Sequence, residues 1–271
     1  MSRQRWRRFF VTPVATCSAE GWRSHGPRGV CDDAHMRLRD GYDVGEQLAA
    51  DPLVWSVPEF LTDIEREHII EIARPRLDAA KVTSTRQNTT STARTGSVAW
   101  VRYDDSEIVR GVVDRVGELV GIPVHHSESM QVVHYAETQE YRPHFDGWRL
   151  DTEKGRLRTE NGGQRVLTAL MYLNKPTAGG GTSFPKLELE VEAEPGRLVI
   201  FHNIADEATN IHDASLHGGM PVTEGEKWAC NLWFRARPYR VGAAAPSRPA
   251  PSRRTGGGVP NRAARRRGQR R

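Results

Sequence analysis

The sequence predicts an α+β fold in which antiparallel strands pack behind two or more helices, as a jelly roll or a similar sandwich. From residue 129 to residue 235 the chain consists of short apolar or alternating runs separated by Gly, Pro and Asn, which is typical of strands. Two helical patterns precede these runs. No helical pattern among them is long enough for the crossovers of a parallel βαβ sheet. We therefore expect an antiparallel core with packing helices on its N-terminal side.

The first helix is predicted to begin at Thr62, which forms a capping box with Glu65. Its apolar stripe, in spite of Pro75, is expected to consist of Ile64, Ile69, Ile72 and Leu77. A second helix follows Asp104 and Asp105. Its apolar side is expected to consist of Ile108, Val109, Val112, Val113, Val116 and Val120.

Residues 83–97 separate the two helices and contain nine Ser or Thr in fifteen positions, which indicates a mobile loop. The run "VAWV" then returns the chain to the core. An idle surface loop and a lid over a site both fit this pattern. The strand-like runs that follow are "SMQVVHY", "RPHFDGW", "RVLTALMYL", "LELEVEAEP", "GRLVIFHN" and "KWACNLWFR".

The positive charge of the chain is concentrated in its two ends. Residues 241–271 contain nine Arg and no acidic residue, and residues 1–35 carry a net charge of +3. Because the whole chain carries +5, the segment 36–240 carries −7. The pI of about 9.3 therefore describes the ends, and it does not by itself predict a nucleic-acid-binding protein.

This distribution predicts three parts: a basic N-terminal extension that is expected to be disordered (1–40), one folded domain (41–240) and a disordered Arg-rich tail (241–271). The tail is built from Gly, Pro, Ala, Ser and Arg, so it buries too little apolar surface to offset its ordering entropy. A solvated tail and a weak contact with nucleic acid or an anionic surface both stay open.

The first nineteen residues are rich in Arg and free of acids, like an organelle transit peptide or a twin-Arg export signal. The apolar run after the arginines is short and is interrupted by Thr12 and Pro13, which argues against export. A third interpretation takes Met36 as the true start. The three cysteines, Cys17, Cys31 and Cys230, lack disulfide or zinc spacing and fit a reducing compartment. We therefore expect a cytoplasmic protein, and we expect no transmembrane helix.

The run "EYRPHFDGW" carries the first candidate site residues. On a strand, His144 and Asp146 project from the same face and Phe145 from the other. Such a pair is either a buried hydrogen-bonded pair or two ligands of a metal. His-x-Asp alone is a weak signal, and by itself it favours the structural pair.

The run "LHGGMPVTEGEKWACNLWFR" supplies a third imidazole, His217, and a lysine, Lys227, ten residues later. Two His and one carboxylate form the facial triad of non-haem Fe(II) oxygenases, which leaves coordination positions open for substrate and oxygen. Fe(II) with one Asp carries +1, and a dianionic 2-oxo acid would bring the site to −1. Buried Lys227 would then restore neutrality.

The segment from about residue 54 to residue 235 resembles the catalytic domain of prolyl 4-hydroxylases, in the Fe(II)/2-oxoglutarate dioxygenase superfamily. The motifs that carry the resemblance are "QVVHY", "YRPHFD", "RVLTALMYLN", "GGGTSFP" and "LHGGMPVTEGEKW", in the family's order. The resemblance implies that the folded domain is a double-stranded β-helix, and that His144, Asp146 and His217 hold Fe(II).

The same resemblance implies roles for four further residues. Lys227 would pair with the distal carboxylate of 2-oxoglutarate, Tyr135 would line the cosubstrate pocket, and Trp233 would form its wall. Arg94 would lie near the peptide groove, and the Ser/Thr-rich loop before it would cover the substrate. Two departures from the family lie near the pocket and are expected to affect substrate choice: Gly181, where the family has the acid of "GGET", and His134, where members vary.

The implied activity is Fe(II)- and 2-oxoglutarate-dependent hydroxylation of a prolyl residue at its 4-position, like that of procollagen-proline 4-dioxygenases, with release of succinate and CO2. Fe(II), 2-oxoglutarate and O2 would be required, and ascorbate is an expected further cofactor. The partner would be a peptide or protein that contains proline. The alternatives are the same chemistry on another residue or a small molecule, or a non-catalytic module that binds nucleic acid through its tail.

Overall fold

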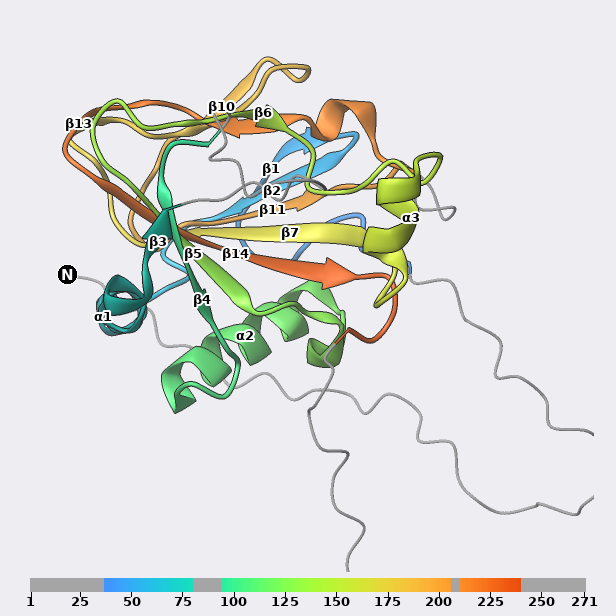
Figure 1. The fold of residues 1–271 in the computed structure, drawn as a ribbon, viewed down its shortest axis with the longest axis horizontal. Coiled ribbons are helices and arrows are strands. Elements are labelled where there is room, and N and C mark those ends of the chain that lie inside the picture. The colour runs from blue at the N-terminus through green and yellow to red at the C-terminus, as the bar shows by residue number, and fades with distance from the viewer. Residues whose placement is uncertain (1–36, 80–93, 206–209, 240–271) are drawn as a thin grey trace, which may run out of the picture. The chain divides into compact units, whose positions relative to one another are not determined.

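The core of the protein is a pair of antiparallel sheets, seen in the computed structural model, which describes residues 37–79, 94–205 and 210–239 (Figure 1). The larger sheet has eight strands, in the order β1 (Glu46–Ala50), β2 (Leu53–Val57), β11 (Leu198–His202), β7 (Arg165–Tyr172), β14 (Lys227–Arg235), β5 (Met130–Tyr135), β4 (Ser97–Val101) and β3 (Asp78–Ala79). The smaller sheet has four, in the order β10 (Leu189–Val191), β9 (Thr182–Phe184), β12 (His217–Gly219) and β6 (Tyr141–His144). A short pair, β13 (Val222–Glu224) with β8 (Ala178–Gly179), completes the jelly roll. The predicted α+β class with an antiparallel core is confirmed.

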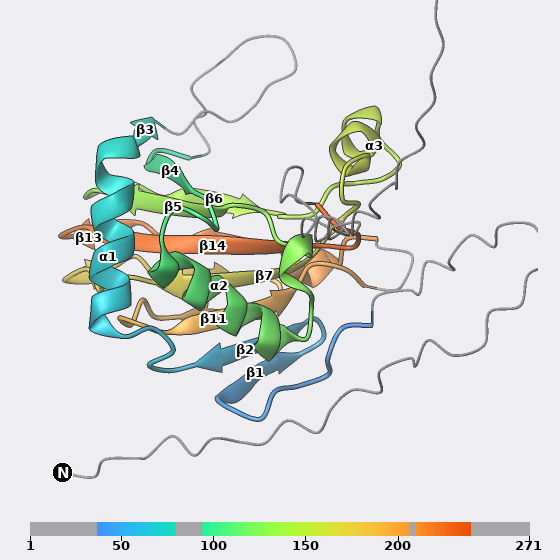
Figure 2. The same cartoon turned by 90° about the horizontal axis from the view of Figure 1, so that it is seen from below.

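Two helices, α1 (Asp63–Ala73) and α2 (Glu107–Val120), lie over one face of the larger sheet (Figure 2). The predicted capping box of α1 is present, because Thr62 accepts from the Glu65 backbone N–H and the Glu65 carboxylate accepts from that of Thr62. The expected apolar stripe of α1 is wrong at both ends. Ile64 is 71% exposed. The helix ends at Ala73, and a 3₁₀ turn (Arg74–Arg76) with Pro75 follows, so Leu77 lies outside it.

The second helix agrees closely with its prediction. Ser106, one residue after the predicted aspartates, is the N-cap and accepts from the Val109 backbone N–H. Gly121, with φ 72°, ends the helix in the left-handed conformation. The buried face contains Val109, Val112, Val113, Val116, Gly117 and Val120, so the valine stripe is what fixes α2 against the sheet.

Strand β14 shows how the larger sheet separates two apolar clusters. Its residues Trp228, Cys230, Leu232 and Phe234 pack in the cluster under the helices. Its alternate residues Lys227, Ala229, Asn231 and Trp233 line a cavity on the opposite side, toward the smaller sheet. Cys230 therefore faces away from the cavity, as the alternation of the strand predicts.

Several elements were not predicted. Strands β1 and β2 extend the larger sheet at one edge, and β3 extends it at the other. The short helix α3 (Glu153–Thr159), capped by Thr152, lies beside the end of β14 and the start of β7 (Figure 1). Residues 1–36 of the predicted N-terminal extension, the Arg-rich tail and most of the Ser/Thr-rich loop lie outside the described residues. Among the helices that are described, none is long and apolar enough to cross a membrane.

Candidate metal centre

Three candidate ligands come together where the smaller sheet faces the larger one. Strand β6 ends at His144, and β12 begins at His217, which lies opposite His144 in the antiparallel register. Asp146 follows two residues after the end of β6. The expectation that Asp146 lies on a strand with His144 is therefore wrong in its local geometry. A bend after the strand, instead of the strand's alternation, brings the carboxylate beside the imidazole.

The distances within this group are those of a compact donor set. The Nε2 atom of His144 lies 3.5 Å from Oδ1 of Asp146, and Nε2 of His217 lies 3.5 Å from Oδ2 of the same carboxylate. One potential ligand atom from each residue lies within 4.8 Å of the others. Asp146 and His217 are buried, with 6% and 7% of their surface exposed.

The tautomers of both imidazoles leave their Nε2 lone pairs free toward Asp146. Nδ1 of His144 lies 3.0 Å from the Arg142 carbonyl oxygen, and Nδ1 of His217 lies 2.9 Å from the Ser215 carbonyl oxygen. Because a carbonyl oxygen only accepts, both Nδ1 atoms carry the proton and donate it. Two imidazole lone pairs and a carboxylate then converge on one point without a proton between them, which is a donor set that fits a divalent cation.

The protonation states agree with this assignment. Burial lowers the pKa of His217 to about 4, so its imidazole is neutral at pH 7. Burial alone would raise the pKa of Asp146, but the imidazoles of His217 and His144 in their protonated forms, and the guanidinium of Arg165, hold it well below its usual range. The group therefore consists of one carboxylate with neutral imidazole beside it, the mixture of ligands that non-haem Fe(II) binds.

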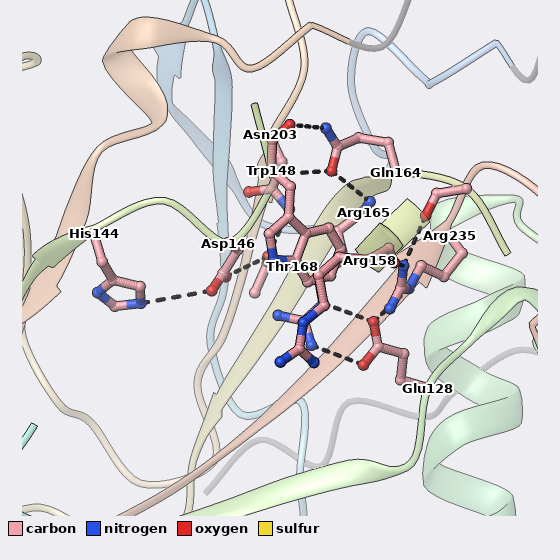
Figure 3. A network of polar contacts seen from close by, with 11 residues as sticks. Glu128, His144, Asp146, Trp148, Arg158, Gln164, Arg165, Thr168, Asn203 and Arg235 are labelled. Atoms are coloured by element: carbon pink, nitrogen blue, oxygen red, sulfur yellow. Dashed lines mark hydrogen bonds and ion pairs between the residues drawn. The ribbon is translucent and has the colours of Figure 1, made fainter. Parts of the chain in front are cut away.

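A buried polar chain orients the carboxylate of Asp146 (Figure 3). The Thr168 hydroxyl donates to Oδ2 of Asp146 at 2.8 Å, and the Asn203 side-chain amide donates to the Thr168 hydroxyl at 2.9 Å. Both supporting residues are fully buried, on β7 and just after β11. Such supporting hydrogen bonds fix the rotamer of a ligand and tune its affinity for a metal.

The candidate ligands open into a cavity of about 510 Å³ between the two sheets. Lys227, at the start of β14, also lines this cavity and is 3% exposed. Its ammonium donates to the Gly181 carbonyl oxygen at 3.3 Å, and within the described parts of the chain it has no ion pair with a carboxylate. Burial lowers the pKa of Lys227 to about 7. A buried lysine without a counter-ion marks a position at which an anionic ligand would be stabilised.

Three other predicted site residues also line the cavity. Tyr135 is buried on β5, and its hydroxyl accepts from Nε of Arg94 at 3.2 Å. Arg94 also donates to Gln131 at 3.1 Å, and its guanidinium lies over the Tyr141 ring. Trp233 is buried on β14, and its indole N–H has no partner among the atoms described. The structure thus brings every predicted site residue to one cavity.

Four residues that shape the same cavity were not predicted from the sequence. The Tyr141 ring stacks on the His144 imidazole, with centroids 3.6 Å apart. Glu128, Arg165 and Arg235 form a buried ion network at one end of the cavity (Figure 3). Arg235 continues the alternation of Lys227 and Trp233 on β14, and that signal was sufficient to find it. Arg165 could not be predicted in this way. The pairing of β14 with β7 changes register between Phe234 and Arg235, so simple alternation does not extend to this end of the pair.

The two residues that depart from the family's pattern, His134 and Gly181, lie in different surroundings. His134 faces away from the cavity, where it pairs with Glu226 at 2.8 Å and packs on Trp228, so the expectation that it lies near the pocket is wrong. Gly181 does lie at the cavity, since its carbonyl oxygen accepts from Lys227. A Cβ atom at Gly181 would lie 2.9 Å from the Val191 carbonyl oxygen. The local backbone therefore has no room for the acid that the resemblance leads one to expect there.

The part of the chain that carries this geometry is similar to known oxygenases. The family described as the 2OG-Fe(II) oxygenase superfamily matches residues 130–235, a range that contains all three candidate ligands and Lys227. The chain is 32% identical over 217 residues to probable prolyl 4-hydroxylase 10 of Arabidopsis thaliana, covering 72% of this chain and 73% of that protein. It is 33% identical over 217 residues to prolyl 4-hydroxylase 5 of the same plant, covering 72% of each.

A solved structure shows the same fold. The viral collagen prolyl hydroxylase from Paramecium Bursaria Chlorella virus-1, in complex with 2OG, aligns with a TM-score of 0.55 and 25% identity. The alignment covers 67% of this chain and 95% of the viral protein. The jelly-roll topology described above is therefore shared with a prolyl hydroxylase.

Proposed function

The chain belongs to the prolyl 4-hydroxylases of the 2OG-Fe(II) oxygenase superfamily, and we propose on this basis that it hydroxylates prolyl residues of a peptide or protein at the 4-position. The observation that carries the proposal is one cavity with two functions. His144, Asp146 and His217 present a donor set for a divalent metal, and Lys227 presents a buried cation to the same space. Fe(II) and 2-oxoglutarate are accordingly the metal and the cosubstrate of the enzyme.

The metal ligands we assign are His144, Asp146 and His217. With O2, bound Fe(II) and 2-oxoglutarate supply the chemistry that converts a C–H bond to C–OH, one oxygen atom entering the product and the other entering succinate as CO2 leaves. The protein keeps the donor set in place: two backbone carbonyl oxygens fix the imidazole tautomers, and Thr168 fixes the carboxylate. Three protein ligands leave other coordination positions for the cosubstrate and oxygen.

Lys227 is assigned to the distal carboxylate of 2-oxoglutarate. Its charge has no carboxylate partner in the described structure, and burial has already lowered its pKa to about 7. A carboxylate beside it would raise that pKa and stabilise the ammonium. The charge balance then closes, because Fe(II), Asp146, 2-oxoglutarate and Lys227 together carry no net charge.

We assign the other lining residues to the positioning of ligands. Tyr135 and Trp233 present buried aromatic surface to the cavity. Arg94 is assigned to the peptide-binding side of the cavity, where it is held by Tyr135 and Gln131.

Ascorbate and O2 belong to the proposal as reaction requirements. O2 is the source of the hydroxyl oxygen, and ascorbate would maintain the iron in its Fe(II) state during repeated turnover. Omitting ascorbate should allow an initial phase of reaction that then slows, and excluding O2 should stop succinate formation. A non-catalytic nucleic-acid-binding module is not favoured, because it gives no account of the ligand set and the buried lysine.

The experiment that tests the proposal uses pairs of synthetic peptides that differ only at one position, proline or alanine. Each pair is incubated with the enzyme, Fe(II), 2-oxoglutarate, ascorbate and O2, and mass spectrometry locates any added oxygen atom. Addition on proline alone, with amino-acid analysis identifying 4-hydroxyproline, supports the proposal. Oxygen added to another residue, or no addition while 2-oxoglutarate is consumed, would assign a different substrate to the same site.

A further inference from the structure

The end of the cavity beyond Asp146 contains two arginines that share one carboxylate (Figure 3). Glu128 accepts from Nε and Nη2 of Arg165 at 2.6 and 2.8 Å, and from Nε of Arg235 at 2.6 Å. Burial alone would raise the pKa of Glu128, but the two guanidiniums hold it below its usual range. Glu128 is therefore ionised and neutralises one arginine, which leaves one positive charge in excess.

Aromatic rings and backbone carbonyls fix these guanidiniums in place. The guanidinium carbon of Arg165 lies 3.6 Å from the centroid of the Trp233 ring, and that of Arg235 lies 4.6 Å from the Trp148 ring. Nη1 of Arg235 also donates to the Gly163 carbonyl oxygen at 2.7 Å. The cationic end is thus a rigid part of the wall, because stacked and hydrogen-bonded arginines lose little further freedom when a ligand binds.

Helix α3 adds two exposed cations to the rim. Lys154 and Arg158 both line the cavity, and neither side chain makes an ion pair within the described structure. Arg156 lies between them on the same helix and does not line the cavity. The backbone carbonyl oxygen of Arg158 accepts from Arg235, which connects the rim to the buried network.

The charges that line the cavity do not balance. Six lining residues are cationic and two are acidic: Arg94, Lys154, Arg158, Arg165, Lys227 and Arg235 against Glu128 and Asp146. Fe(II) and 2-oxoglutarate, with Asp146 and Lys227, form a neutral set. The remaining side chains then leave an excess of four positive charges on the substrate side. The surrounding segment 36–240 carries −7, so this excess is local to the cavity.

We propose that the peptide substrate carries acidic side chains within a few residues of the target proline, and that Arg158, Lys154 and the Arg165–Arg235 pair bind them. This inference rests on the proposed function, since it names the class of peptide that the same site accepts. Carboxylates are the groups that guanidinium donors bind best, and a cavity lined by one sign of charge also raises the association rate of an oppositely charged ligand. Trp100, half-exposed at the same rim beside Trp233, offers apolar contact for the proline-containing backbone.

The test compares three fluorescein-labelled peptides with one central proline and Glu, Gln or Lys at the flanking positions. Binding to the full chain with Fe(II) and 2-oxoglutarate is measured by fluorescence anisotropy without O2, and turnover is then measured with O2. The Glu peptide should bind at least about tenfold more tightly than the Gln peptide at low salt, and the difference should shrink as ionic strength rises. The Lys peptide should bind most weakly.

Two charge-reversal variants on α3 localise the effect. Arg158→Glu should weaken binding of the Glu peptide by about fivefold or more while changing the Gln peptide little. Arg156→Glu is the matched control, since it makes the same charge change on the same exposed helix and keeps the basic ends of the chain. Its affinity for the Glu peptide should stay within about twofold of the wild type.

The outcomes separate this inference from the function on which it rests. Equal binding and turnover of the Glu and Gln peptides would leave the hydroxylase in place and overturn the acidic preference. An equal loss in both variants would also overturn it, because the preference would then arise from the general field or from the basic tail. Oxidation of no prolyl peptide would instead count against the proposed function, and the anisotropy data would still report whether the cavity selects acidic peptides.

Discussion

At the scale of single residues, the metal centre depends on residues that never contact the metal. Asp146 accepts from Thr168, and Thr168 in turn accepts from Asn203, so the orientation of one carboxylate is fixed by a fully buried chain. The three ligands were predictable from their types and order in the sequence. Thr168 and Asn203 were not, because nothing in a strand sequence distinguishes a hydroxyl that supports a ligand from one that pairs within the sheet.

Replacing Thr168 with valine should weaken metal binding without removing a ligand. The change conserves volume and leaves Oδ2 of Asp146 and the Asn203 amide without their hydrogen bonds to Thr168, so we expect the affinity for Fe(II) to fall by about tenfold or more. Isothermal titration with Fe(II) without O2 measures this directly, and Thr168→Ser is the control that retains the hydroxyl. Unchanged metal affinity in the valine variant would show that Thr168 does not position Asp146.

The burial of Lys227 lowers the stability of the ligand-free protein. Burial lowers its pKa from 10.5 to about 7, so below pH 7 the ammonium is charged both in the folded and in the unfolded protein, and folding bears the full desolvation cost. Between pH 7 and 10.5 the unfolded chain binds more protons than the folded one. The cost therefore declines as pH rises through this window.

Lys227→Met should consequently stabilise the ligand-free protein while abolishing binding of 2-oxoglutarate. We expect a gain of about 2 kcal/mol or more in the free energy of unfolding at pH 6, and a smaller gain at pH 9. Chemical denaturation at the two pH values measures the gain, and calorimetry with 2-oxoglutarate measures the loss of binding. A variant that is less stable than the wild type at pH 6, or that binds 2-oxoglutarate normally, would exclude Lys227 as the buried counter-ion.

At the scale of elements, the site is made where strands end and bend. Alternation along β14 accounts for the position of Lys227 and Trp233 in the cavity and of Cys230 on the other face. The same rule misplaced Asp146, because β6 ends at His144 and the rule holds only while the chain stays extended. Ile64 was misassigned for a related reason: it lies in the first turn of α1, where an apolar residue can face water although the helical period is kept.

The glycine-rich segment before β9 controls the approach of Lys227. Gly181→Glu would bring a Cβ to 2.9 Å from the Val191 carbonyl oxygen and displace the backbone that accepts from Lys227. We expect a loss of about 1–3 kcal/mol in stability, together with weaker binding of 2-oxoglutarate. Gly111→Glu is the matched control, since a Cβ at that exposed helical position meets nothing within 4 Å.

The control variant should be at least as stable as the wild type, because glutamate forms helix better than glycine. Thermal unfolding of both variants and titration with 2-oxoglutarate give the comparison. If Gly181→Glu were as stable as Gly111→Glu and bound the cosubstrate normally, the segment would have room for an acid and the absence of one in this chain would need another explanation.

At the scale of the whole molecule, the sequence predicted the class of fold but not every strand of the larger sheet. The short strand-like runs separated by Gly, Pro and Asn, together with two helical patterns, were sufficient to predict an antiparallel α+β core. Strands β1 and β2 form a local hairpin before the first helix, but their place in the sheet could not be inferred, because the pairing of β2 with β11 joins residues that are far apart in the chain.

The division into a basic extension, a catalytic domain and an Arg-rich tail stays a prediction, as do the cytoplasmic location and the start at Met1 or Met36. Contacts near both boundaries bear on it: Leu38, within the predicted extension, packs against the core of the domain, and Arg39 donates to the Leu119 carbonyl oxygen. Tyr239 lines the cavity, its ring lies 4.5 Å from the Arg235 guanidinium, and its backbone N–H donates to the His125 carbonyl oxygen. The catalytic domain therefore includes residue 239.

Deleting residues 241–271 should leave catalysis on short peptides within about twofold of the full chain, since every assigned site residue precedes the deletion. Steady-state kcat/KM with one prolyl peptide measures this. A deletion that also removes Tyr239 should impair turnover, because Arg235 would lose a packing partner. A large loss from the shorter deletion would make the tail part of the active domain.

We assign His144, Asp146 and His217 as the ligands of the Fe(II) with which O2 would oxidise 2-oxoglutarate and a prolyl peptide. The most direct test of this assignment is succinate formation with Fe(II), 2-oxoglutarate, ascorbate and O2, compared for wild type and His144→Ala, with and without the peptide. We expect peptide-stimulated succinate formation, with one hydroxyproline for each succinate, in the wild type alone. Equal succinate formation by His144→Ala, with its fold intact by circular dichroism, would contradict it.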